Sequence, residues 1–270
     1  MSLQLVEQRL THAVLFSPDG DVPEPAELLY QAPVVIERGS FRPVTKVTPE
    51  MLTRSLERMR QEPDMCGREP VVLMEMTLRN LQSLGEQVVH ADLLARVDVL
   101  RALGRTVMVT NYSRFHNGTT YQRRYSPERI GLVVGIPVLA QILDEKHYTD
   151  LDGGLLDALG RLLAGPVKLY VYPWRRAATG EMVTAENFAV PPRLVHLYAY
   201  LRENHFVESI ETPTDPDLSV MPHDVLALIE AHDPAWEGLL PREAVEVIKE
   251  SRLFGYAPAH RGVDLSLRPD

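Results

Sequence analysis

The sequence predicts an α/β protein with a Rossmann-like, mainly parallel sheet, helices on both faces and a small helical C-terminal appendage. Two observations lead to this fold class. Short apolar runs typical of buried strands alternate with segments whose apolar residues recur at helical spacing. The strands are followed directly by polar and basic residues, as where parallel strands present their carboxyl ends to a ligand. Right-handed crossovers between parallel strands explain the alternation.

Four apolar runs are the predicted strands of the sheet, and a shorter run at 34–36 precedes them. The four runs are residues 71–76, 106–109, 130–134 and 167–172. A helix over residues 93–103 should end at Gly104 in a left-handed conformation. Prolines suited to a first helical turn mark three helix starts, at Pro49, Pro137 and Pro241. Asp152 is the expected cap of a leucine-rich helix over 155–163.

The last quarter of the chain has a different composition. A further helix over 194–201 should stop at Asn204, and residues 212–222 are rich in Pro, Asp, Thr and Ser, as in a linker. Two helices are expected after it, at 224–231 and 242–251. We therefore expect three parts: an α/β domain over 1–206, a linker and helical appendage over 207–256, and a disordered tail over 257–270.

Composition excludes several classes of partner. The 270 residues carry a formal net charge of −9 and have a pI near 5.5. General binding of nucleic acid or an anionic membrane needs an excess of Lys and Arg, so we expect neither. The single cysteine, Cys66, cannot form an intramolecular disulfide and is typical of a reducing compartment. No apolar run has the length of a membrane span, and the expected location is the cytoplasm.

Polar and basic residues that follow two of the predicted strands form the candidate binding site. A mixed polar, aromatic and basic segment follows 106–109, and a Gly-Ser turn flanked by arginines follows 34–36. Guanidinium forks and turn amides are suited to a phosphate group. The candidate phosphate-binding residues are Arg38, Ser40, Arg42, Thr110, Asn111, Arg114, Arg123, Arg124 and Lys146. Solvated surface charge and a charged hairpin edge would produce the same pattern, and both stay open.

Carboxylates near Lys146 are a candidate metal site. Asp150 and Asp152 follow Lys146 closely enough to hold a divalent ion such as Mg²⁺, which phosphoryl chemistry would need. A solvated helix end explains the same residues more simply.

Five segments are distinctive enough to carry a resemblance. They are residues 37–43, 75–80, 111–112 with 121–125, 151–154 and 168–173. Together they resemble a family of poorly characterised bacterial proteins that carry two labels, nicotinate-nucleotide adenylyltransferase and TonB-dependent receptor. The resemblance covers nearly the whole chain and implies that it corresponds to the C-terminal portion of longer members. The H-x-G-H motif of the first activity is absent, and the nearest approach is residues 116–119. The many alternating strands of the second are not expected either.

A weaker similarity connects residues 107–111 with the second motif of haloacid-dehalogenase-like phosphohydrolases. It implies that Thr110 binds phosphate, with Lys146 and then Asp150 and Asp152 following in a suitable order. The nucleophilic aspartate of that group has no counterpart, since Leu73 stands in its place.

Two hypotheses of different classes follow. In the first, a cytoplasmic protein binds a phosphorylated small molecule or nucleotide at the strand ends. If it is an enzyme, the reaction would be phosphoryl or nucleotidyl transfer or hydrolysis. In the second, the protein is a non-catalytic subunit of a homo- or hetero-oligomer, and the Tyr and Arg residues of the segment after 106–109 contact another chain.

Overall fold

The chain folds around one seven-stranded sheet in the computed structural model, which describes residues 2–78, 90–176, 178–212 and 220–257. The strand order is β1-β4-β3-β2-β5-β6-β9, and a separate hairpin pairs β7 with β8. The strands are β1 (Ala13–Phe16), β2 (Val34–Arg38), β3 (Val71–Thr77), β4 (Thr106–Thr110), β5 (Ile130–Gly135), β6 (Val167–Tyr172), β7 (Trp174–Arg175), β8 (Met182–Val183) and β9 (Val207–Ser209).

Six of the seven strands are parallel, and only β1, paired with β4, is antiparallel. From β2 the chain builds outward through β3 to β4, then crosses back to β5 and builds the other half through β6 to β9. The strand order therefore reverses between β2 and β5. The crevice outside the carboxyl ends at such a reversal is where open α/β sheets hold ligands. The predicted Rossmann-like fold is confirmed.

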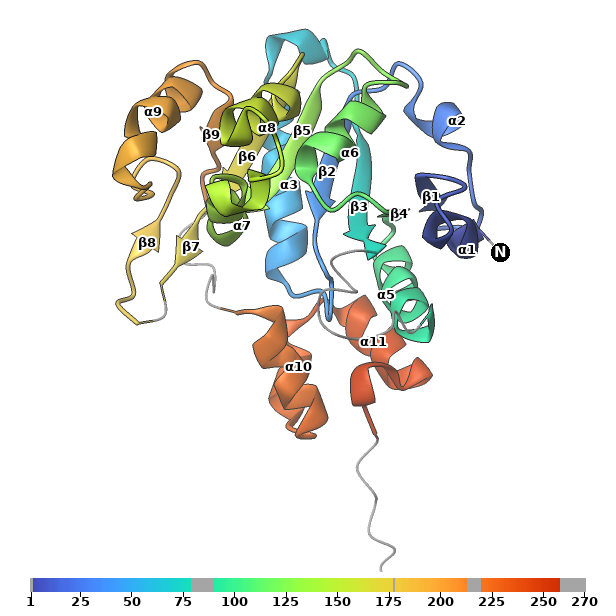
Figure 1. Cartoon of the computed structure of the whole chain (residues 1–270). Helices are drawn as coiled ribbons and strands as arrows, with labels where there is room; N and C mark the ends of the chain where they lie inside the picture. Colours follow the sequence, from blue (N-terminus) through green and yellow to red (C-terminus); the bar gives the residue numbers. More distant parts are fainter. Residues whose placement is uncertain (1, 79–89, 177, 213–219, 258–270) are drawn as a thin grey trace, which may run out of the picture.

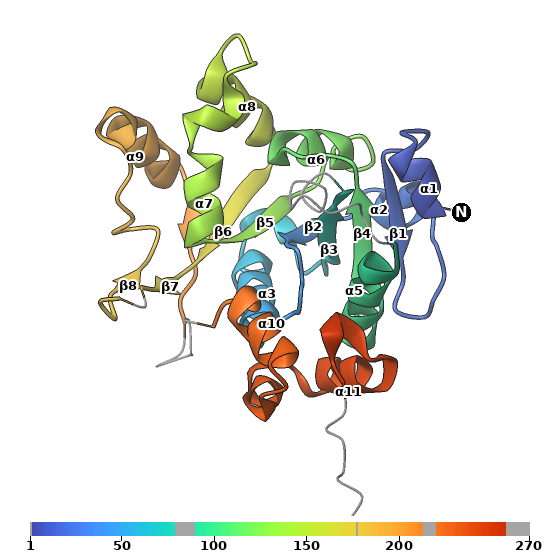
Figure 2. The ribbon, with the colours of Figure 1, turned by 60° about the horizontal axis from the view of Figure 1, so that its bottom comes forward.

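Helices cover both faces of the sheet (Figure 2). One face carries α2 (Pro25–Leu29), α6 (Phe115–Gln122), α7 (Ile136–Ile142), α8 (Gly154–Leu162) and α9 (Val195–Glu203). The other carries α1 (Ser2–Glu7), α3 (Val47–Arg60) and α5 (His90–Ala102), and the C-terminal helices α10 (Pro222–Glu230) and α11 (Arg242–Ser251) join the same core. Because side chains alternate along each strand, neighbouring residues of β2 such as Val35 and Ile36 join different cores.

The C-terminal helices lie beyond the carboxyl ends of the strands, at the bottom of Figure 1. Trp236, in the short 3₁₀ helix η4 (Pro234–Leu239), is 2% exposed and belongs to the same core as the sheet. The amide of Lys46, just before α3, donates to the carbonyl of Leu239 at 3.0 Å. This appendage therefore packs as part of the α/β body.

Several local expectations are confirmed. Strand β6 and helix α11 have the predicted bounds, and Asn204 is the C-cap of α9. Gly104 has φ of +69° and its amide donates to the carbonyl of Arg101, so it ends α5 in the left-handed conformation.

Three local expectations differ from the structure. Strand β9 pairs with β6, so the sheet continues past the boundary expected at residue 206. Gly153, not Asp152, is the N-cap of α8, and no side chain caps that helix. Residues 115–122 form helix α6 within a segment expected to be a loop. The centre of the expected linker and nearly all of the expected tail lie outside the described residues. Within the described ranges, no helix has the length and apolar character needed to cross a membrane.

Candidate functional site

The carboxyl ends of three adjacent strands bring together a buried network of Arg38, Glu75 and Thr110. Arg38 is the last residue of β2 and lies beside Glu75 of β3 in the parallel register. Its Nε donates to Glu75 Oε2 and its Nη2 donates to Oε1, both at 2.8 Å. The Thr110 hydroxyl at the end of β4 donates to Glu75 Oε1, also at 2.8 Å. One carboxylate therefore ties three strand ends together.

Helix α6 packs against this network on one face of the sheet. The guanidinium carbon of Arg38 lies 4.2 Å from the centre of the Phe115 ring, a cation–π contact. A Cβ placed on Gly118 would lie 2.8 Å from Arg38 Nη2, so only glycine fits there. We call Arg38, Glu75, Thr110, Phe115 and Gly118 the Arg38 cluster.

The charges of the Arg38 cluster are almost fully removed from water. The side chains of Arg38 and Glu75 are 5% and 2% exposed. Burying a charge is costly unless it is paired and hydrogen-bonded, and the bidentate pair meets that requirement for Nε and Nη2. Arg38 Nη1 is different, because this buried nitrogen has no hydrogen-bond partner among the described residues. This guanidinium therefore keeps N–H donors that no described residue satisfies.

A second group of side chains lies next to the cluster at the start of α6. Arg114, the N-cap residue of α6, forms an ion pair with the exposed Asp150 and lies 5.9 Å from the centre of the Tyr148 ring. His116, in the first turn, is buried. Burial and the nearby Arg114 charge lower the pKa of His116, which keeps its imidazole neutral at pH 7.

A pocket of about 260 Å³ opens where β4 ends and β1 begins. We call it the β4-end pocket; it is lined by Arg9, His12, Asn111, Tyr112, Ser113 and Asn117. The rings of His12 and Tyr112 are stacked, with centroids 5.4 Å apart and planes 18° from parallel. Tyr112 in turn lies 5.7 Å from Tyr121, whose own ring is 5.2 Å from Tyr125. This pocket, which is lined by aromatic and amide side chains, therefore adjoins the Arg38 cluster through Asn111, the residue after Thr110.

The loop after β2 turns two predicted residues toward α5. The Arg42 Nε lies 3.4 Å from a carboxylate oxygen of Asp92, in the first turn of α5. The Ser40 carbonyl accepts a hydrogen bond from Arg96 Nη1 at 3.2 Å. These contacts attach the loop to the α3 and α5 side, whereas the Arg38 guanidinium lies on the α6 side.

Arg123 lies near the amino ends of the strands, away from Arg38 and Thr110 at the carboxyl ends. It follows the last residue of α6, and its Nη1 donates to the carbonyl of Ala164 at 2.6 Å. Its Nη2 donates to the carbonyl of Arg161 at 3.1 Å, so Arg123 caps the end of α8 just before β6 starts. Arg124 is exposed on the surface.

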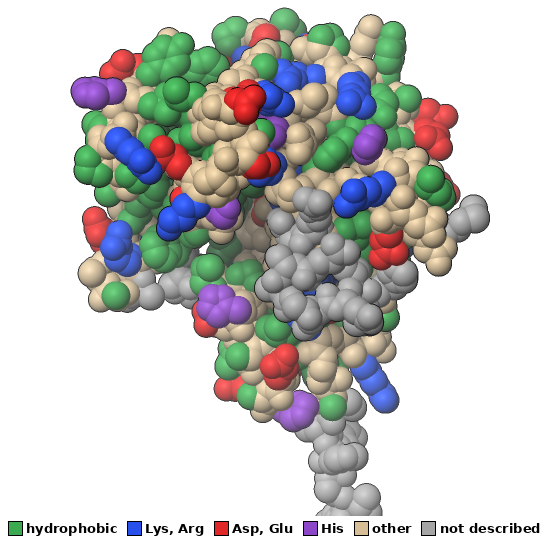
Figure 3. Space-filling view, viewed as in Figure 1, with side chains coloured by type: hydrophobic (Ala, Val, Ile, Leu, Met, Phe, Trp, Pro, Cys, Tyr) green, Lys and Arg blue, Asp and Glu red, His purple; other side chains and the backbone are tan. Residues whose placement is uncertain are grey.

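The predicted arginines consequently do not surround one cavity. Helix α6 runs from the carboxyl ends of the strands back to their amino ends and separates Arg114 from Arg123. On the face shown in Figure 3, lysine and arginine side chains are interspersed with acidic ones instead of forming one continuous basic patch. Two further arginines are bound to protein groups: Arg101 donates to the carbonyl of Ser17, and Arg129 forms an ion pair with Asp64.

The candidate metal residues are dispersed as well. Lys146 is exposed on the short helix η2 (Glu145–Tyr148), Asp152 is exposed, and Asp150 binds Arg114. Over the described parts of the chain, no three His, Cys, Asp or Glu side chains are grouped closely enough to hold a metal ion.

A second carboxyl group is buried at β2, on the opposite face of the sheet from Arg38. Glu37 is 5% exposed, and its Oε2 has no hydrogen-bond partner within the described residues. Burial raises the pKa of Glu37 to about 8, although the Arg105 charge and a hydrogen bond with Thr48 oppose the rise. Glu37 is therefore mostly protonated at pH 7 and sits next to the strand-order reversal.

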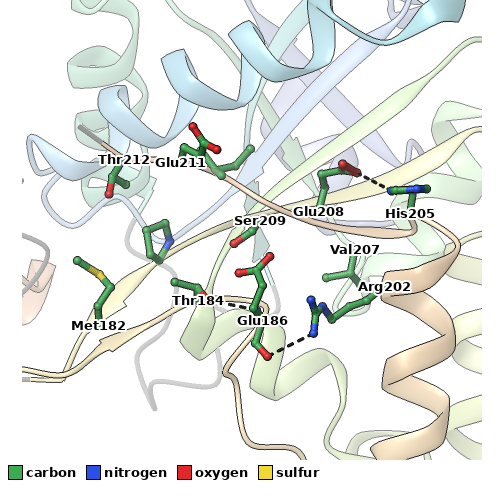
Figure 4. Close-up of a pocket in the computed structure, with 12 residues that line it drawn as sticks. Met182, Thr184, Glu186, Arg202, His205, Val207, Glu208, Ser209, Glu211 and Thr212 are labelled. Atoms are coloured by element: carbon green, nitrogen blue, oxygen red, sulfur yellow. Dashed lines mark hydrogen bonds and ion pairs between the residues drawn. The ribbon is translucent and has the colours of Figure 1, made fainter. Parts of the chain in front are cut away.

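The β9-edge pocket, a separate hollow of about 600 Å³, lies between the β7–β8 hairpin and β9 (Figure 4). Its lining includes Glu186, Glu208 and Glu211, with Arg202 and His205 as the basic residues. Burial disfavours ionisation of Glu186 and Glu208, but hydrogen bonds outweigh it and lower the pKa of both. Three carboxylates facing two basic groups make this pocket a poor receptor for a phosphate.

A network of ion pairs lies near the amino ends of the strands, and its charged groups bind one another. Buried Lys168 of β6 donates to Glu62 at 2.6 Å and to Glu208 at 3.2 Å. Arg58 of α3 donates to Glu208 at 2.6 Å. This network fastens the end of α3 to the sheet edge, and each of these charges already has a protein partner.

No family model matches this chain, and no curated protein is significantly similar to it.

The sequence pointed to Arg38, Thr110 and Asn111, but the residues that contact them or lie beside them were not predicted. Glu75 and Glu37 carried a usable signal, since a carboxylate inside an apolar strand must be buried and therefore paired or protonated. Phe115 and Gly118 carried none, because glycine, asparagine and threonine give α6 weak helix propensity.

Proposed function

We propose that the protein binds a phosphorylated small molecule or nucleotide at the carboxyl ends of β2, β3 and β4. Arg38 is the anchoring residue, and Thr110 helps to hold Glu75 and thereby Arg38 in place. The proposal concerns binding. A phosphoaspartyl reaction is not part of it, since Leu73 is a fully buried apolar residue of β3 and no nucleophile stands there.

The observation that carries the proposal is the buried Nη1 of Arg38, which has no partner within the described chain. The Nε and Nη2 atoms of Arg38 are held by Glu75, and the Phe115 ring packs against the guanidinium. The orientation of the N–H donors that remain is therefore fixed. Pre-organised donors of this kind bind anions without losing side-chain entropy. The position supports the same conclusion, because β2 borders the reversal of strand order.

The alternative, a non-catalytic subunit anchored through the Tyr and Arg residues after β4, receives less support. Anchoring residues of an interface need to be exposed in the isolated chain. Tyr121 is buried and Arg123 is committed to the end of α8. Arg124 is the exposed basic residue that remains for such a role.

Calorimetry and thermal unfolding with inorganic phosphate, pyrophosphate, ribose 5-phosphate and AMP would test the proposal. A ligand at one hundred times its Kd stabilises the native state by about 2.7 kcal/mol, or roughly 5–10 °C in Tm. Arg38→Lys should abolish that stabilisation, because one ammonium group cannot both satisfy Glu75 and occupy the place of Nη1.

Arg123→Ala is the matched control, since it removes a guanidinium at the other end of the strands. It should leave ligand binding unchanged. Absence of any Tm shift or heat with all four ligands in the wild-type protein would refute the proposal. Equal loss of binding in Arg38→Lys and Arg123→Ala would show that the ligand binds elsewhere.

A further inference from the structure

The β4-end pocket has the chemistry of a nucleobase site. Its lining combines the His12 and Tyr112 rings, which stack on each other, with the amide side chains of Asn111 and Asn117. Aromatic rings stack on the flat face of any base, and asparagine amides pair with donor and acceptor atoms on a base edge. Its volume of about 260 Å³ is suited to one planar ring system and is below the usual range for a drug-sized ligand.

The position of the pocket connects it to the Arg38 cluster. Asn111 follows Thr110 directly, and Asn117 lies two residues after Phe115, which covers the Arg38 guanidinium. Strands β2 and β4 are separated by β3, so their ends are about 10 Å apart, two strand spacings. A single nucleotide, with its ribose between base and phosphate, can bridge that distance.

We propose that the ligand is a nucleoside phosphate whose base lies in the β4-end pocket while its phosphate reaches Arg38. This inference rests on the proposed function and narrows its ligand class from phosphorylated molecules in general to nucleotides. Tyr112 provides the stacking surface, and Asn117 contacts the edge of the base. The polar lining selects against purely apolar rings, because burying the two amides without partners would be unfavourable.

The test compares three ligand types on the wild-type protein by calorimetry: the four common ribonucleoside 5′-monophosphates, ribose 5-phosphate, and the matching nucleosides. At least one nucleotide should bind about tenfold more tightly than ribose 5-phosphate, the lower end of what stacking one base contributes. Tyr112→Leu and Asn117→Ala should each reduce the ratio of nucleotide affinity to ribose 5-phosphate affinity toward one. Neither should change the affinity for ribose 5-phosphate. Asn117 is exposed, so its substitution should not affect folding.

Tyr200→Leu is the matched control for Tyr112→Leu, since Tyr200 is also stacked on a neighbouring ring but lies on α9, with 55% exposure. Tyr200→Leu should leave the ratio of nucleotide affinity to ribose 5-phosphate affinity unchanged. If ribose 5-phosphate binds and no nucleotide binds more tightly, the base pocket is refuted and the phosphate site stands. If nucleosides bind as tightly as nucleotides, the phosphate site is refuted and the base pocket stands. If none of the ligands binds, both are refuted.

Discussion

Replacing Gly118 by alanine should destabilise this protein, although the same change in a helix interior normally stabilises. Gly118 lies within α6, where alanine is favoured over glycine by about 1 kcal/mol. The new Cβ would lie 2.8 Å from Arg38 Nη2 and 3.6 Å from Glu75 Oε1. The guanidinium cannot turn away freely, because two 2.8 Å hydrogen bonds to Glu75 and the Phe115 ring hold it.

The expected size follows from these opposing effects. The close contact can be relieved in one of two ways. The fixed group is overpacked, at about 1–3 kcal/mol, or the guanidinium moves and a charged hydrogen bond weakens, at about 1.5–3 kcal/mol. After the helix-propensity gain is subtracted, we expect Gly118→Ala to lower the free energy of unfolding by about 1–2 kcal/mol.

Gly160 supplies the control within the same protein. It lies inside α8, and a Cβ placed on it meets nothing within 4 Å. Gly160→Ala should therefore stabilise by up to about 1 kcal/mol. The two variants should differ by about 2–3 kcal/mol in urea unfolding, or roughly 4–12 °C in Tm. Equal stabilisation by both substitutions would refute the placement of a clamped Arg38 against α6.

Three further predictions concern other buried groups. Arg38→Met should cost about 3–5 kcal/mol by leaving Glu75 unpaired, whereas Arg38→Met with Glu75→Leu should recover most of the loss in urea unfolding; a loss below about 1 kcal/mol in the single variant would contradict this. The contribution of Glu37 to the stability of the wild-type protein should fall as pH rises from about 4.5 to about 8, because the unfolded chain ionises this residue first. At 1.36 kcal/mol per pH unit the fall is on the order of 4–5 kcal/mol, and Glu37→Gln should abolish it; equal pH slopes in both proteins would refute this. Arg123→Ala should destabilise by about 1–2 kcal/mol through loss of the α8 cap, and unchanged Tm would contradict that role.

Local patterns were sufficient for most of the secondary structure. Buried parallel strands such as β5 are continuous apolar runs, and α8 and α11 repeat apolar residues at helical spacing. These elements can therefore be recognised from neighbouring residues alone. Strand β9 could not be found in this way, since three residues without a distinctive pattern become a strand only by pairing with β6. Helix α6 is similar, because packing against α8 offsets its poor helix propensity.

The candidate site was only partly predictable for the same reason. Arg38 and Thr110 were recognisable because each follows or ends an apolar strand. That Glu75 joins them depends on the register of β2, β3 and β4, which no single segment determines. The tertiary structure also separates Arg123 from the Arg38 cluster. Helix α6 connects two parallel strands, so it must return to the amino ends of the strands before β5 begins, and Arg123 follows its last residue.

By itself, the sequence determined the class of fold, the parallel direction of the strands from β2 to β6 and the presence of an arginine just after the apolar run of β2, since these depend on composition and periodicity along the chain. It gave no indication of β1, the antiparallel strand. Only the tertiary structure decided which charges meet. Partners for Arg38, Arg42, Arg114 and Arg123 lie 36 to 50 residues away along the chain, and strand order and helix direction select them.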